Sequence, residues 1–129
     1  MKDNFRFDQY QAIDELILSN LREFDDLDDE TNFVDVLIQI YRQEAPVAFQ
    51  GLQEAFSNAD QRGIIHWSHK LKGLSRNLGV RRLSEVCNTI EHEAGSLHMS
   101  ELRRLIGLVE AELDEAFRLL HEHMTDKAA

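Results

Sequence analysis

The chain has 129 residues and a mass of 15.0 kDa, with 43% hydrophobic and 29% charged residues. This size and composition are typical of one globular domain and exclude two large domains. Fourteen lysines and arginines stand against 24 aspartates and glutamates, a net charge of −10, which is the wrong sign for a protein that binds nucleic-acid phosphates. We therefore expect no nucleic-acid partner.

Three features bear on the cellular location. No stretch approaches the about 18 apolar residues of a membrane helix, so we expect no membrane contact. The amino terminus carries acids where a signal peptide has a basic flank and an apolar core. Cys87 is the single cysteine and forms no internal disulfide, which agrees with a reducing compartment. We expect a cytoplasmic protein.

Helices account for the pattern of apolar residues. Six glycines and one proline are too few for the turns of an all-β chain, and apolar residues recur at spacings of three and four. The first predicted helix is capped by Asp8 and reaches Phe24. Its apolar stripe contains Tyr10, Ile13, Leu16, Ile17 and Leu21. The acidic run DDLDDE, residues 25–30, is interpreted as a solvated linker, so residues 1–30 form an N-terminal helix and linker.

Four more helices are predicted, and each has an apolar stripe at helical spacing. They run from Thr31 to Phe56, from a cap at Asn58 or Asp60 to Asn77, from Val80 to Gly95, and from Ser100 to Met124. Pro46 is expected to kink or restart the second helix. Short connections make successive helices antiparallel. We predict an all-α fold, an antiparallel up-and-down four-helix bundle over residues 31–124 with an additional N-terminal helix, and a disordered tail at 125–129.

His69 points away from the apolar stripe of its helix. At about 100° per residue, the centre of that stripe lies opposite His69. The stripe consists of Ile64, Trp67, Leu71, Leu74 and Leu78. We expect an exposed imidazole without a packing role, which in the simplest interpretation is an ordinary surface histidine.

Basic residues gather around His69. The stretch from Gln61 to Ser84 contains no aspartate or glutamate, whereas the average of the chain would place about four to five there. It contains six basic residues, namely Arg62, Lys70, Lys72, Arg76, Arg81 and Arg82. This local reversal of charge indicates an anionic ligand or partner. The alternative is a basic face that only balances acidic helices beside it.

Gly73 follows His69 by one turn and lies on the same face. Glycine inside a helix costs about 1 kcal/mol relative to alanine, so it indicates a need for space beside the imidazole. A helix C-cap is the alternative. An accessible neutral imidazole can attack phosphorus, and ammonium or guanidinium groups can hold the phosphoryl oxygens. The residues therefore predict a histidine nucleophile for phosphoryl transfer.

Glu91 lies about 40° from Cys87 on the next predicted helix, at the border of its buried stripe. A carboxylate here can accept the proton of the ring nitrogen of His69 that is not used for attack, which would fix the tautomer. A simple salt bridge from Glu91 to Lys72 or Arg82 fits the spacing equally well. Cys87 is interpreted as a small buried apolar residue and not as a redox centre.

Residues 67–91, WSHKLKGLSRNLGVRRLSEVCNTIE, resemble the motif of histidine-containing phosphotransfer (HPt) domains. Eight positions match in register without an insertion, namely His69, Leu71, Lys72, Gly73, Gly79, Leu83, Cys87 and Glu91. Residues 33–60 resemble the second helix of the family with its Ala-Pro break, so the resemblance covers roughly residues 31–124. Ser68 stands where the family often has alanine. Arg76 replaces a commonly small or polar residue, which can tune the choice of partner.

The resemblance implies a phosphorelay function. His69 would accept a phosphoryl group on Nε2 from a receiver-domain aspartyl phosphate or a histidine kinase, and pass it to a receiver aspartate. Lys72 would steady the phosphoryl group, Gly73 would admit the partner, and Glu91 would hydrogen-bond the imidazole. The partner-facing set that we expect is Arg62, Ile65, His66, Lys70, Gly73 and Arg76.

The chain is expected to be a phosphoryl carrier without kinase or phosphatase activity of its own, because it has no glycine-rich nucleotide loop and no kinase motif. We expect it to bind no cofactor, since Mg²⁺ would come from the acidic pocket of the receiver. A monomer is expected because the bundle closes its own core.

Two other classes of function fit parts of the sequence. His66 and His69, three residues apart, suggest a metal-binding helical bundle, but the repeated Glu-x-x-His pairs of di-metal bundles are absent. A passive helical adaptor that binds an acidic signalling partner without phosphorylation fits the basic face. An acid-labile label that disappears on substitution of His69 would distinguish the phosphotransfer function from both.

Overall fold

The computed structural model describes residues 6–24 and 32–124, and these residues form an all-α fold. The helices are α1 (Glu15–Arg22), α2 (Phe33–Ser57), α3 (Gln61–Asn77), α4 (Arg81–Glu93) and α5 (Met99–His123). The predicted acidic linker at 25–30 and the predicted tail at 125–129 lie outside the described residues. Within the described ranges, no helix is long and apolar enough to cross a membrane.

The first helix begins later than the sequence predicts. Asp14, and not Asp8, is its N-cap, and the Asp14 side chain accepts a hydrogen bond from the backbone N–H of Leu16. The preceding residues run along the turn between α3 and α4, where the backbone N–H of Asp14 donates to the carbonyl of Gly79 at 2.7 Å. The prediction of a helix from Asp8 was wrong because this segment satisfies its backbone groups by pairing with the turn.

Local signals explain the boundaries of α2 and α3. α2 continues through Pro46 without restarting, since the proline ring removes a single N–H and the rest of the helix is held by packing. Of the two candidate caps for α3, Asp60 is the one used, and its side chain accepts from the backbone N–H of Gly63 at 3.0 Å. Gly79 follows the end of α3 with φ +80°, a left-handed conformation that favours glycine.

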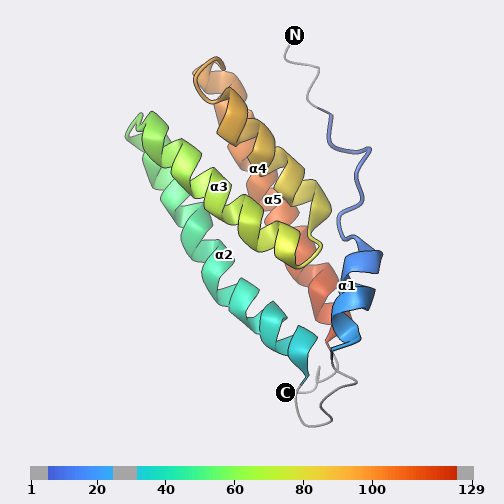
Figure 1. The fold of residues 1–129 in the computed structure, drawn as a ribbon. Coiled ribbons are helices and arrows are strands. Elements are labelled where there is room, and N and C mark those ends of the chain that lie inside the picture. The colour runs from blue at the N-terminus through green and yellow to red at the C-terminus, as the bar shows by residue number, and fades with distance from the viewer. Residues whose placement is uncertain (1–5, 25–31, 125–129) are drawn as a thin grey trace.

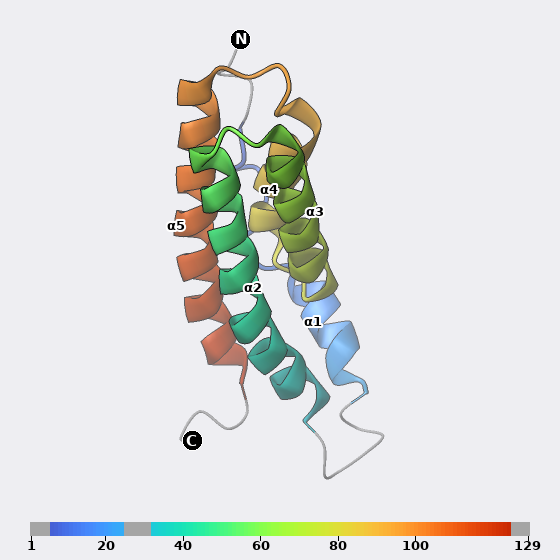
Figure 2. The same cartoon turned by 90° about the vertical axis from the view of Figure 1, so that its left-hand side faces the viewer.

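The four long helices run alongside one another with alternating direction, as the sequence predicts (Figure 1). α3 packs mainly between α2 and α4, and α4 also contacts α5. Because α3 and α4 are shorter than α2 and α5, they leave one end of α2 uncovered, and α1 lies beside that end (Figure 2). The antiparallel pair of α3 and α4, joined by a short turn, is the element that positions the candidate site.

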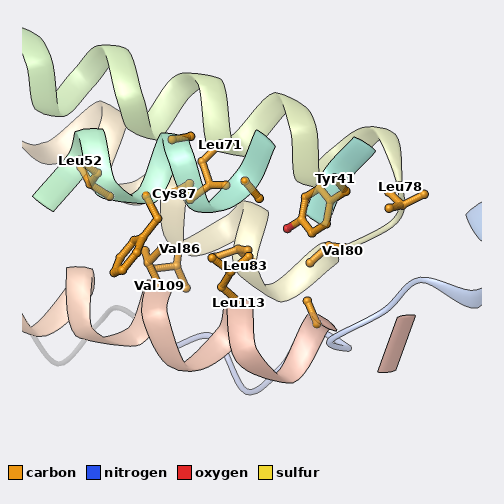
Figure 3. Packing of buried hydrophobic residues seen from close by; sticks show 14 of the residues in the cluster. Tyr41, Leu52, Leu71, Leu78, Val80, Leu83, Val86, Cys87, Val109 and Leu113 are labelled. Carbon is orange, nitrogen blue, oxygen red and sulfur yellow. The ribbon is translucent and has the colours of Figure 1, made fainter. Parts of the chain in front are cut away.

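Aliphatic side chains from all the long helices fill the core (Figure 3). Cys87 is fully buried among them, as expected for an apolar position, and burial raises the pKa of its thiol. α2 and α3 approach closely at Gly51, where a Cβ atom would lie 2.4 Å from the ring of Trp67. Two residues of the first predicted helix are exposed instead of buried, Leu16 at 68% and Phe24 at 55%.

Candidate functional site

His69 lies in the middle of α3 and faces solvent. Its side chain is 66% exposed, while its neighbours Ser68 and Leu71 are completely buried. Buried residues on one side of α3 therefore hold the helix to the bundle, and the imidazole projects from the other side. This is the orientation that the helical spacing predicts.

Glu91 reaches His69 from the neighbouring helix. The Oε2 atom of Glu91 lies 2.8 Å from Nδ1 of the imidazole, and Oε1 lies 2.7 Å from Nζ of Lys72. The spacing in the sequence allowed either the imidazole contact or a salt bridge, and the structure contains both. Arg82, the other candidate partner of Glu91, pairs with Glu112 at 3.4 Å instead.

Lys72 is covered, although the sequence placed it on the open face beside His69. Its side chain is only 11% exposed, because its direction on α3 is toward α4. Its Nζ donates a hydrogen bond to Oδ1 of Asn88 at 3.3 Å. Sequence reasoning missed Asn88, and the available signal was its position three residues before Glu91, on the same face of α4.

The charges around Glu91 keep its carboxyl group ionised. Burial by itself would raise the pKa of Glu91, but hydrogen bonds and charge interactions with Lys72 and then His69 outweigh it, and the pKa lies below its ordinary value. An ionised carboxylate can only accept a hydrogen bond, so a neutral His69 ring must carry its proton on Nδ1. The lone pair is then on Nε2, to which no described residue makes a hydrogen bond.

The surface beside His69 is open and basic. A Cβ atom added to Gly73 would meet nothing within 4 Å, so the glycine leaves free space next to the imidazole. Among the other predicted partner-facing residues, Ile65 is half-buried, and the rest are exposed, namely Arg62, His66, Lys70 and Arg76.

Besides the covered Lys72, two arginines of the basic stretch do not belong to this surface. Arg81 pairs with Glu85 and lies over the ring of Tyr10, while Arg82 donates to the backbone carbonyl of Tyr10. These two arginines anchor the segment before α1. In addition, the part of the chain described by the structure contains no group of three or more potential metal ligands.

The Hpt domain family matches the chain over residues 36–119, which include His69, Lys72, Asn88 and Glu91. This chain belongs to the Hpt domain family. The predicted family is thus confirmed. Hpt proteins are carriers of phosphoryl groups.

Two similar proteins agree with this family. Multistep phosphorelay regulator 1 of Schizosaccharomyces pombe is 33% identical over 82 residues, which are 64% of this chain and 28% of the relative. The chain therefore spans less than a third of the length of that relative. The crystal structure of histidine-containing phosphotransfer protein B (HptB) from Pseudomonas aeruginosa PAO1 has a TM-score of 0.74 at 20% identity, with coverage of 87% of this chain and 93% of that chain. This likeness confirms the all-helical bundle fold.

Proposed function

We propose that His69 is the phosphoryl acceptor and donor of this Hpt protein. In this proposal it receives the group from the aspartyl phosphate of a receiver domain or from a histidine kinase, and passes it to a receiver aspartate. The observation that carries the proposal is the exposed imidazole with Nδ1 at 2.8 Å from Glu91, which leaves the Nε2 lone pair directed away from its protein partner.

The transfer requires no base to deprotonate the attacking atom. Nε2 forms a bond to phosphorus as the bond between phosphorus and the aspartyl oxygen breaks, and the aspartate leaves as a carboxylate. The imidazole retains its Nδ1 proton and becomes positively charged. Glu91, already ionised, stabilises that charge. The reverse reaction transfers the group to another aspartate by the same steps.

The exposed cations beside His69 support a receiver domain as the partner. Arg62, Lys70 and Arg76 attract an acidic surface, and the space at Gly73 allows the attacking and leaving atoms to approach in line. The Mg²⁺ ion that neutralises the transferring group would be held by carboxylates of the receiver. We further propose a cytoplasmic, monomeric carrier, which the free thiol of Cys87 and the closed core support.

The test is transfer from a phosphorylated receiver domain to the purified chain. We expect an acid-labile, alkali-stable label that disappears in His69→Gln and remains in His98→Gln, a matched exposed histidine at the start of α5. Incubation with ATP and Mg²⁺ alone is expected to give no label, as for a carrier without kinase activity. Label that persists in His69→Gln would refute the proposal, and receiver binding without any label would favour a passive adaptor.

A further inference from the structure

The Lys72 ammonium occupies a covered position between α3 and α4, where water satisfies few of its donors. An ammonium has three N–H donors, and in a covered position each unpaired donor is costly. Two acceptors meet it from α4, Oε1 of Glu91 at 2.7 Å and Oδ1 of Asn88 at 3.3 Å. Both acceptors lie on the same face of α4, one turn apart, so a single turn of α4 contacts the ammonium at two points.

The two contacts of the ammonium differ in kind. Oε1 of Glu91 is completely buried, and Nζ of Lys72 at 2.7 Å compensates its charge as a close ion pair. The contact with Asn88 is a longer hydrogen bond to a neutral amide oxygen, at 3.3 Å. Because a hydrogen bond is directional, Asn88 gives the ammonium a second fixed acceptor, and the two oxygens together determine where it lies.

We infer that Asn88 is a positioning residue for phosphoryl transfer at His69. Its amide oxygen holds the Lys72 ammonium against Oε1 of Glu91, and this keeps Oε2 on the Nδ1 proton of the imidazole. The inference rests on the proposed function and adds a third residue behind the Glu91 contact. Lys72 then acts on the imidazole through Glu91, whatever contact it also makes with the phosphoryl group.

The physical consequence lies in the tautomer of His69. Without the Asn88 acceptor, the ammonium gains by turning toward water, and Oε1 of Glu91 is left buried without its counterion. The carboxylate then rotates to follow the ammonium or to reach water, and its hydrogen bond to Nδ1 weakens. An imidazole freed from this acceptor can place its proton on Nε2, where no lone pair remains for attack.

The experiment compares Asn88→Leu and Asn88→Ala, which remove the acceptor, with Asn88→Asp, which retains an oxygen in the same position. Asn20→Leu on the exposed surface of α1 is the matched control. The imidazole ¹⁵N chemical shifts of His69 in the unphosphorylated chain report its tautomer. Phosphorylation by phosphoramidate, a small donor that needs no receiver docking, reports the reactivity of Nε2.

We expect Asn88→Leu and Asn88→Ala to lower the share of the Nδ1-protonated tautomer and to slow phosphorylation about tenfold, the size of effect that follows from one weakened hydrogen bond to a charged group. Asn88→Asp and Asn20→Leu are expected to behave like the parent chain. A bond that only holds α3 to α4 would change stability and leave the tautomer unaltered.

An unchanged tautomer and rate in folded Asn88→Leu or Asn88→Ala would overturn the inference and leave the proposed function intact. Failure of the parent chain to become phosphorylated at His69 would overturn the proposed function instead. The tautomer measurement still decides the role of Asn88 in that case, because it uses the unphosphorylated chain.

Discussion

His69, Glu91 and Lys72 lie close together, but they differ sharply in their exposure to water. The imidazole is 66% exposed, whereas the side chains of Glu91 and Lys72 are 16% and 11% exposed. Salt and solvent screen the interactions of the exposed ring far more than those of the covered ion pair. The carboxylate that contacts the ring is therefore held inside the helix pair, while most of the ring faces solvent.

Glu91 should make the stability of the fold depend on pH in the acidic range. Its pKa in the fold lies below the ordinary value of about 4.5, so its contribution to stability is complete above that value and is lost as the pH falls through the folded pKa. Urea unfolding over a series of pH values should show that the free energy of unfolding of the parent falls more steeply below pH 4.5 than that of Glu91→Gln. Parallel curves for the two chains would contradict the ion pair.

At the scale of the elements, some glycines inside helices are required by packing and others are not. Gly51 is required by packing, because a Cβ atom would collide with the Trp67 ring at 2.4 Å. Gly73 on α3 and Gly107 on α5 have no neighbour within 4 Å of an added Cβ, so nothing in the described fold requires them. Each weakens its helix by about 1 kcal/mol relative to alanine. For Gly73, the compensation in our proposal is access of the receiver to His69.

Gly73→Leu and Gly107→Leu form a matched pair that tests this role. Both should raise the free energy of unfolding by up to about 1 kcal/mol, because leucine favours the helix and neither site is crowded. Only Gly73→Leu should weaken receiver binding and slow transfer. The measurements are urea unfolding and transfer from a phosphorylated receiver. Equal transfer rates for the two variants would show that the space beside His69 has no function.

At the scale of the whole molecule, the face around His69 is positively charged although the net charge of the chain is negative. The chain carries −10 overall, yet the exposed face of α3 around His69 presents Arg62, Lys70 and Arg76. The next two arginines along the chain are engaged with the segment before α1 and with α5. In our proposal, this face attracts the acidic surface of a receiver, while the net charge of the molecule opposes its approach from other directions.

Receiver association should therefore depend on salt and on Arg76. Raising the ionic strength should slow association, and Arg76→Gln should slow it a few-fold at low salt while reducing its dependence on salt. Arg118→Gln is the control, since Arg118 lies on α5 and is paired with Glu115 and Glu122. Stopped-flow association at several salt concentrations measures both effects. An equal effect of the two substitutions would indicate attraction by net charge alone.

The sequence by itself determined the helical class, the order of the helices and the outward direction of His69. These follow from apolar spacing and from short connections, which act over a few neighbouring residues. It also placed Asp60 among two candidate caps and Glu91 within reach of either His69 or Lys72. Each of these predictions depends on one helix or on one pair of consecutive helices.

Only the tertiary structure decided which side chains are covered by α4 and by the turn between α3 and α4. The burial of Lys72, the contact of Asn88 with it, and the start of α1 at Glu15 all depend on how one element lies against another. Helical spacing gives the direction of a side chain around its own axis. It does not give the rotation or register of the neighbouring helix, and that register determines which polar groups meet in the site.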